Sequence, residues 1–227
     1  MKSLKLPKRL QAIADHIEKT ASVTDVGTDH GLLPVYLAQN KLAHRIIATD
    51  ISENSLKSAL RTAAKYEMNG LITFETGAGL ENIDETRADV IVTAGMGGET
   101  IIGVLEQAPW TKKPGIKLIL QPQTKIGELC GWLYENEYTI NDAELVSEKG
   151  KLYIIIIAGG GKTTVPDEPE IELMMILKKK RDPLFAAYLQ EQIDRALHAA
   201  EGIANSGTPG NAENMQKKLE ELVKIAR

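Results

Sequence analysis

Short runs of β-branched and aliphatic residues, separated by segments with helical periodicity, constrain the fold of this chain more than any other feature. Each run has three to seven residues and is nearly continuous in apolar character, as is typical of strands that are covered on both faces. The six runs span residues 23–26, 46–49, 72–74, 90–93, 116–120 and 152–158. Helices are predicted between them over residues 32–39, 53–67, 98–107 and 125–135. This alternation predicts an α/β protein with a doubly wound, mostly parallel sheet.

The order of elements changes after residue 135, where helices no longer separate the strands. Residues 138–145 and 152–158, joined through Glu148, Lys149 and Gly150, predict a hairpin. We expect this hairpin to close the sheet with an antiparallel C-terminal strand, which is common at the edge of an otherwise parallel sheet.

Both ends of the chain have helical patterns. Residues 5–18 place apolar side chains on one helical face. Residues 159–166 have the glycine-rich composition of a linker. Three helical stretches follow, over residues 168–180, 183–203 and 211–226, with breaks at 182–183 and 206–210. We therefore predict a sheet domain over residues 1–160 and a small all-helical, coiled-coil-like domain over residues 166–227.

Charge and cysteine content limit the protein class. The net charge of −4 is unevenly distributed: residues 1–19 carry +3, residues 20–169 carry −7, and residues 170–227 are neutral. Cys130 is the single cysteine, which excludes an internal disulfide and a cysteine-rich zinc site, and we expect it to be buried on a helix. The sequence has no apolar run of membrane-spanning length and no leader-like start, so we expect a cytoplasmic protein. Neither a metal requirement nor an oligomer is indicated, and a monomer is compatible with the sequence.

The turn after the first predicted strand has the composition of a cofactor loop. Asp25, Gly27, Asp29 and Gly31 lie between that strand and the next helix, where a glycine turn lets a ligand approach the backbone and the helix N-terminus. Asp29 occupies the position of the second glycine of a dinucleotide fingerprint. Its charge would repel a pyrophosphate and suit a cation, which favours S-adenosylmethionine over a nicotinamide dinucleotide. The competing interpretation is that Asp29 caps the following helix.

Further candidate cofactor contacts follow the second and third strands. Asp50 ends the second strand, 23 residues after Gly27, at the spacing of an acid that accepts hydrogen bonds from ribose hydroxyls. The alternative is that Asp50 caps the next helix, although Ser52 already fits that role. The loop after the third strand can cover an adenine ring. The cofactor residues proposed so far are Asp25, Gly27, Asp29, His30, Asp50, Ile51, Gly79 and Leu80.

The fourth and fifth strands end in further candidate site residues at the same sheet edge. Ala94, Gly95 and Met96 are proposed to contact the cofactor, while Gly97 and Gly98 would let the substrate approach the backbone. A tight strand-to-helix turn is the structural alternative for these glycines. After the fifth strand, Gln121 and Pro122 are proposed substrate contacts, because an amide group can hold a base.

Two basic clusters could bind phosphate. Lys8 and Arg9 lie on the N-terminal helix, and a second cluster lies near the end of the first C-terminal helix: Lys178, Lys179, Lys180 and Arg181. The alternative for the second cluster is a solvated helix face, and His30 is as compatible with a capping role as with catalysis.

Several of these segments together resemble one bacterial enzyme family. The chain combines a Leu-Pro-Lys-Arg-Leu opening, Asp25-Val26-Gly27-Thr28-Asp29-His30, Ala94-Gly95-Met96-Gly97-Gly98, Leu118-Ile119-Leu120-Gln121-Pro122 and C-terminal helices. It resembles the bacterial tRNA (adenine-N1)-methyltransferases that act on position 22 of tRNA, the TrmK family. The resemblance implies a Rossmann-like catalytic domain, S-adenosylmethionine as the methyl donor, and tRNA bound partly by the C-terminal helices. Leu32 departs from the aromatic residue common in the family, and Thr49-Asp50 departs from the usual end of its second strand.

The predicted function is therefore methylation of N1 of an adenine in tRNA, with Asp29 as the catalytic residue that stabilises the developing positive charge or accepts a proton. Three alternatives stay open at this point. The first is a methyltransferase that acts on another RNA site, on a protein or on a small molecule. The second is a non-catalytic module that binds RNA or a nucleotide. The third is a nicotinamide dehydrogenase.

Overall fold

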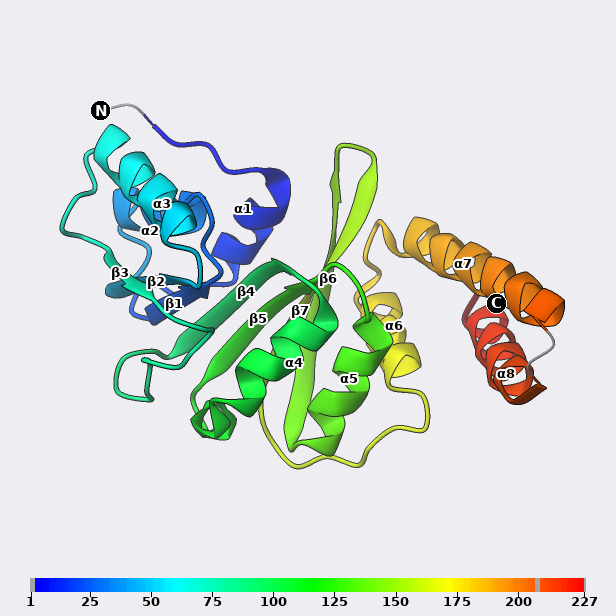
Figure 1. Ribbon diagram of the computed structural model, residues 1–227. Coiled ribbons are helices and arrows are strands. Elements are labelled where there is room, and N and C mark those ends of the chain that lie inside the picture. Colours follow the sequence, from blue (N-terminus) through cyan, green and yellow to red (C-terminus); the bar gives the residue numbers. More distant parts are fainter. Residues whose placement is uncertain (1–2, 207–208, 227) are drawn as a thin grey trace.

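A single seven-stranded sheet forms the centre of the molecule (Figure 1). The computed structural model describes residues 3–206 and 209–226. The strands are β1 (Ser22–Val26), β2 (Arg45–Asp50), β3 (Thr73–Thr76), β4 (Val90–Met96), β5 (Lys117–Pro122), β6 (Tyr138–Glu148) and β7 (Lys151–Gly160). Their order is β3-β2-β1-β4-β5-β7-β6, with parallel pairs from β3 to β5 and antiparallel pairs at β5-β7 and β7-β6. The doubly wound sheet with an antiparallel C-terminal part is confirmed.

Helices cover both faces of the sheet, which explains the continuous apolar character of its inner strands. They are α1 (Lys8–Asp15), α2 (Leu32–Gln39), α3 (Glu53–Lys65), α4 (Gly98–Glu106), α5 (Ile126–Glu135), α6 (Pro169–Lys180), α7 (Phe185–Ser206) and α8 (Pro209–Ala226). Buried residues of α1, α2 and α3 pack with Val23, Val92 and Ile119 on one face. Those of α4, α5 and α6 pack with Ile91 and Leu118 on the other face. Cys130 is fully buried on α5, as expected.

Local chemistry shifts several element boundaries from their predicted positions. The predicted helix over residues 5–18 begins only at Lys8, because Pro7 has extended backbone angles and disfavours a helical conformation at Leu6 before it. Gly159 and Gly160, predicted as linker, belong to β7. A Cβ atom on Gly160 would lie 1.7 Å from the carbonyl oxygen of Lys112, so glycine permits a close backbone approach there. The short 3-10 helix that provides this contact, Pro109–Lys112, was not predicted.

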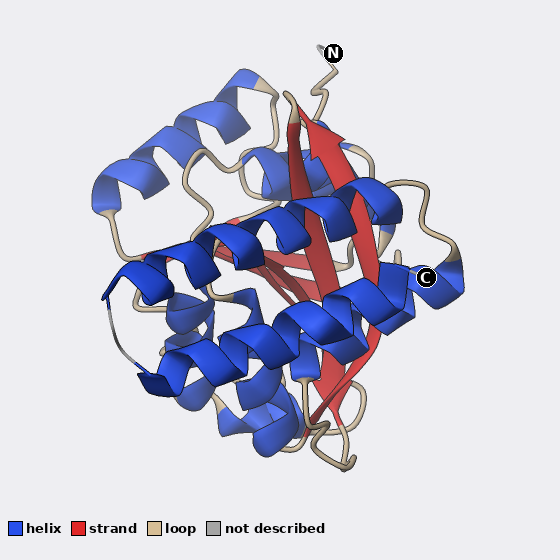
Figure 2. Ribbon diagram, turned by 90° about the vertical axis from the view of Figure 1, so that its right-hand side faces the viewer, coloured by secondary structure: helices blue, strands red, loops and turns tan. Residues whose placement is uncertain are grey.

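The C-terminal helices pack beside the hairpin formed by β6 and β7 (Figure 2). Leu173, Met174 and Leu177 of α6 belong to the same apolar core as the sheet, and Tyr188 of α7 and Leu222 of α8 extend that core outward. All three predicted C-terminal helices are present. The predicted break between the last two includes Gly207 and Thr208, which lie outside the described residues. The division at residues 160–166 stays a prediction.

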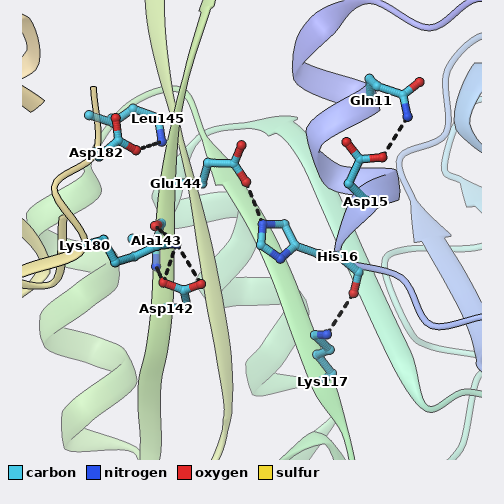
Figure 3. A network of polar contacts seen from close by, with 10 residues as sticks. All are labelled: Gln11, Asp15, His16, Lys117, Asp142, Ala143, Glu144, Leu145, Lys180 and Asp182. Atoms are coloured by element: carbon cyan, nitrogen blue, oxygen red, sulfur yellow. Dashed lines mark hydrogen bonds and ion pairs between the residues drawn. The ribbon is translucent and has the colours of Figure 1, made fainter. Parts of the chain in front are cut away.

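Strand β6 joins the N-terminal helix to the C-terminal helices through polar contacts (Figure 3). The His16 Nε2 atom at the end of α1 lies 2.8 Å from Oε2 of Glu144 on β6. On the other side, Lys180 Nζ donates to Asp142 and to the carbonyl of Ala143, and the Leu145 N–H donates to Asp182. Because β6 is an edge strand, these contacts also occupy part of its free edge.

Within the described ranges, no helix is long and apolar enough to cross a membrane.

Candidate functional site

A cavity of about 720 Å³ opens at the carboxyl ends of the parallel strands. The strand order reverses between β1 and β4, and ligands of doubly wound sheets bind in the crevice at such a switch point. The predicted site residues that line it are Arg9, Asp25, Gly27, Asp29, His30, Asp50, Ile51, Gly79, Ala94, Gly95 and Met96. Four strand-end loops far apart in sequence therefore meet at one site.

Asp50 presents a carboxylate that two backbone amides hold in place. Its Oδ2 atom accepts from the N–H of Asp29 at 3.1 Å, and its Oδ1 atom accepts from the N–H of Ser52 at 2.8 Å. Each oxygen keeps a second lone pair for a ligand hydroxyl. The cap of α3 is the Ser52 hydroxyl, which accepts from the N–H of Ser55. Asp50 is thus oriented at the cavity wall and is not needed as the cap.

Asp25 provides a buried carboxyl group in the same wall. It is 5% exposed, and burial raises its pKa to about 7, with a further rise from the Asp50 carboxylate and an opposing effect of the Thr28 side chain. A cationic ligand in the cavity would restore the charged form of Asp25.

The raised pKa of Asp25 predicts a pH-dependent stability difference. An aspartate in the unfolded chain has an ordinary pKa near 3.8. Ionisation of Asp25 therefore destabilises the fold increasingly from about pH 4 to pH 7, and by a constant amount above pH 7. Asp25→Asn should therefore raise the free energy of unfolding more at pH 8 than at pH 5. Urea unfolding at both pH values measures this difference. If the difference in free energy of unfolding between the variant and the wild type stays constant or decreases with rising pH, the raised pKa of Asp25 is contradicted.

Two conditions require glycine in the β1–α2 turn, namely a left-handed backbone and close packing against α3. Gly27 and Gly31 both have positive φ, at 71° and 66°. Gly31 is the N-cap residue of α2, and a Cβ atom there would lie 2.7 Å from Cβ and 3.0 Å from Cα of Ala59 on α3. The amides of Gly27 and Thr28 donate to the carbonyl of Thr49, which fixes the turn against the end of β2.

Gly31→Ala is expected to reduce the free energy of unfolding by about 2–4 kcal/mol, since it combines left-handed backbone strain with overpacking against a backbone atom. Gly70→Ala is the matched control, because Gly70 has a φ of 77° and a Cβ atom there would meet nothing within 4 Å. The control should lose only about 1–2 kcal/mol, from the left-handed backbone strain alone. Urea unfolding of both variants separates the cost of backbone strain from the cost of overpacking. Equal decreases in the free energy of unfolding would contradict the overpacking at Gly31.

Asp29 lies at the cavity mouth in a left-handed conformation with a φ of 48°. Its side chain is 67% exposed, and its Oδ2 atom lies 3.5 Å from Nε2 of His30. A hydrogen bond of 2.8 Å joins Nδ1 of His30 to Oγ of Ser58 on α3. No side chain caps α2, so Asp29 is not a helix cap.

Two glutamines at the end of β5 have different surroundings: Gln121 lies within the strand and Gln123 directly follows it. Gln121 is fully buried and lies off the cavity wall, because strand alternation turns it toward α1, where its Oε1 atom accepts from Arg9 Nη1 at 3.3 Å. Gln123 lines the cavity, and its Nε2 atom lies 3.3 Å from a Cβ atom built on Gly95. The amide available to a ligand is therefore that of Gln123. Arg9 itself reaches the cavity and is anchored by Glu148 of β6.

Four other proposed contacts have packing roles in this structure. Leu80 is buried in the apolar core, and Pro122 is buried in the ladder between β4 and β5. A Cβ atom on Gly98 would lie 2.5 Å from the carbonyl oxygen of Lys125, and one on Gly97 would lie 3.1 Å from Oγ1 of Thr124. These glycines bring the start of α4 close to the β5–α5 loop. Lys8 lines a separate groove between α1 and β6.

Half of the C-terminal basic cluster is engaged within the protein. Lys178 Nζ donates to the carbonyl of Ile225 at 2.7 Å, and Lys180 bonds to Asp142 and Ala143. Lys179 and Arg181 are exposed, and neither has an ion pair in the part of the chain that the structure describes. Among the described residues, Lys179 and Arg181 are thus the members of this cluster whose side chains are most readily available to phosphate.

One wall of the cavity was not predicted from the sequence. It consists of Thr100, Gly103 and Val104 of α4 and of its C-cap residue Gln107. Their spacing of three, one and three residues places them on one helical face, which is a signal that the sequence contains.

Comparisons with known proteins identify the family. Residues 6–156 match the family described as "Methyltransferase domain". The tRNA (adenine(22)-N(1))-methyltransferase of Bacillus subtilis (strain 168) is 32% identical over 227 residues, which cover 98% of this chain and 94% of the relative. The chain belongs to the TrmK family.

Two TrmK-like crystal structures agree with this membership. The B. subtilis M1A22 tRNA methyltransferase TrmK has a TM-score of 0.85 at 29% identity, with 99% and 100% of the two chains covered. The putative tRNA (m1A22) methyltransferase Sp1610 of Streptococcus pneumoniae, in complex with S-adenosyl-L-methionine, has a TM-score of 0.82 at 25% identity, with 96% and 98% covered.

The TrmK cavity of this chain fits a cationic nucleoside cofactor. Three carboxyl groups, those of Asp25, Asp29 and Asp50, lie on its wall, and Asp50 has acceptor sites for ribose hydroxyls. Gly27 and Gly79 let a ligand approach the backbone, and a volume of about 720 Å³ accommodates a ligand of this size. Among the described residues, no group of three or more side chains that could ligate a metal is present.

Proposed function

We infer that this protein is an S-adenosylmethionine-dependent methyltransferase that methylates N1 of adenine at position 22 of tRNA. The observation that carries the inference is the acidic cavity at the switch point, in a chain that matches a tRNA (adenine(22)-N(1))-methyltransferase over 98% of its length. The dehydrogenase alternative is disfavoured, because the carboxylate of Asp29 lines the cavity and would repel a pyrophosphate.

The cavity residues would divide the binding of the cofactor among them. Asp50 would accept hydrogen bonds from the ribose hydroxyls, the turn at Gly27 would admit the ligand to the backbone, and the carboxyl groups of Asp25 and Asp29 would favour its positive charge. When bound, S-adenosylmethionine supplies an electrophilic methyl group, and the protein mainly aligns donor and acceptor.

The acceptor base would enter from the mouth of the cavity. N1 lies on the pairing edge of adenine, so the nucleotide must be unpaired or flipped out before it can react. Gln123 and Arg9 line the entrance beside Gly95, where an amide and a guanidinium can contact the base and its phosphate. Asp29 would stabilise the positive charge that develops on the adenine, because its carboxylate lies at the mouth with a backbone fixed through Asp50.

A labelled-methyl assay tests the function against its alternatives. The purified protein, bulk tRNA and labelled S-adenosylmethionine should yield label in tRNA that nuclease digestion recovers as a methyladenosine. Label in protein or in small molecules in place of tRNA would support another methyltransferase. Cofactor binding without any transfer would support a non-catalytic module.

Several finer points are proposed with this function. tRNA as the substrate implies that the protein acts in the cytoplasm. We also propose that the helices over residues 166–227 contact tRNA through the charges of Lys179 and Arg181, which the structure leaves exposed.

A further inference from the structure

The β6–β7 hairpin projects beyond the sheet at the same edge as the cavity (Figure 1). The last pair between β5 and β7 is Leu120 with Ile156, whereas β6 and β7 remain paired as far as Glu148 with Lys151. The five residue steps from Ile156 to Lys151 span about 16 Å at roughly 3.3 Å per residue. Because β7 runs antiparallel to β5, this extension passes the carboxyl end of β5, where the cavity opens.

The tip of this hairpin carries two lysines. Lys149 and Gly150 form the turn, with φ angles of 51° and 78°, and Lys149 and Lys151 are both exposed. Neither lysine has an ion pair within residues 3–206 and 209–226. The neighbouring carboxylate of Glu148 is turned inward, with its side chain only 14% exposed.

The orientation of Glu148 fixes the direction of the tip. Its carboxylate accepts from the backbone N–H of Arg9 at 3.2 Å and lies 3.8 Å from Arg9 Nε. Arg9 also lines the cavity, so this one residue connects the end of β6 with the cavity wall. Glu148 and Lys151 are directly opposite in the β6–β7 ladder, and opposite residues of an antiparallel pair face the same side. Lys151 therefore faces the α1 side of the sheet, where Lys5 and Lys8 are also exposed.

We propose that the hairpin tip, through Lys149 and Lys151, contacts the phosphate backbone of tRNA beside the cavity mouth. The proposal rests on the proposed function, because it names a further contact surface for the same substrate. Residues 20–169 have a net charge of −7, which would repel a polyanion from the cavity. Exposed lysines on a projecting hairpin counter this repulsion where a flipped nucleotide would enter, and its flanking phosphates would lie nearby. Such contacts position the RNA without reading its sequence.

The double variant Lys149→Gln/Lys151→Gln tests the hairpin contact. We expect it to weaken tRNA binding about tenfold at 50 mM salt and to reduce the slope of log Kd against log salt by about one to two. S-adenosylmethionine affinity and the thermal midpoint should stay unchanged, because both side chains are exposed. Lys149→Arg/Lys151→Arg, which keeps both charges, should bind like the wild type.

Lys19→Gln/Lys41→Gln is the matched control, since it removes two exposed lysines that precede β1 and β2 at the opposite edge of the sheet. It should leave the salt slope unchanged. The proposal is overturned if the hairpin variant has the wild-type slope, or if the control lowers the slope equally. Failure of the proposed function would differ from both results, because the wild-type protein would then neither bind nor methylate tRNA.

Discussion

Asp50→Ala is expected to weaken S-adenosylmethionine binding by about tenfold to a hundredfold. A hydrogen bond to a charged group contributes about 1.5–3 kcal/mol, and about 1.4 kcal/mol corresponds to a tenfold change in affinity. The Asp50 carboxylate is held by the amides of Asp29 and Ser52, so it is oriented before the ligand arrives and loses little freedom on binding. Isothermal calorimetry measures the change directly.

Asp84→Ala is the control for the loss of a turn-forming carboxylate. Asp84 accepts from the N–H of Thr86, two residues on, at 2.8 Å, as Asp50 does from Ser52, but it lies outside the cavity. The control should bind the cofactor normally. If Asp50→Ala binds with the same affinity as the wild type and Asp84→Ala, Asp50 has a structural role only.

Asp29→Asn is expected to lower kcat by about a hundredfold to a thousandfold, as is typical when a preorganised electrostatic contact to the reacting group is removed. Asparagine has nearly the same shape and tolerates the left-handed conformation that Asp29 adopts, so the turn should be preserved. The affinities for S-adenosylmethionine and tRNA should change by no more than a few-fold. Single-turnover kinetics with both ligands saturating isolates the chemical step.

Glu67→Gln provides the control for this substitution. Glu67 is also exposed and has a φ of 61°, but it follows α3 and lies outside the cavity. It should have wild-type kcat. Turnover of Asp29→Asn within a few-fold of the wild type would exclude an electrostatic role of Asp29 in the chemical step.

Local pattern is sufficient to predict the elements of the sheet and the edge at which its loops meet. Strands covered on both faces give apolar runs that can be read directly, and parallel strands necessarily bring their carboxyl ends together. Asp25, Asp29 and Asp50 can therefore be assigned to one site from the sequence, and all three line the cavity.

Contacts across long sequence separations cannot be predicted in this way. Arg9 and Glu148 are 139 residues apart, and nothing in either segment indicates their hydrogen bond. The burial of Gln121 depends on which face of β5 it occupies, and this placement rather than its residue type removes it from the cavity wall. Lys178 and Lys180 have the same appearance in sequence as free surface lysines, yet both bond to distant backbone carbonyls.

The proposed function requires this cavity to direct a methyl group to N1 of adenine 22 of tRNA. The most direct test uses two tRNA transcripts that differ only at position 22, one with adenosine and one with guanosine, each incubated with the protein and S-adenosylmethionine. Nucleoside mass spectrometry should detect close to one 1-methyladenosine per molecule of the first transcript and none in the second. Equal methylation of both transcripts, or methylation at an atom other than N1, would contradict the claim.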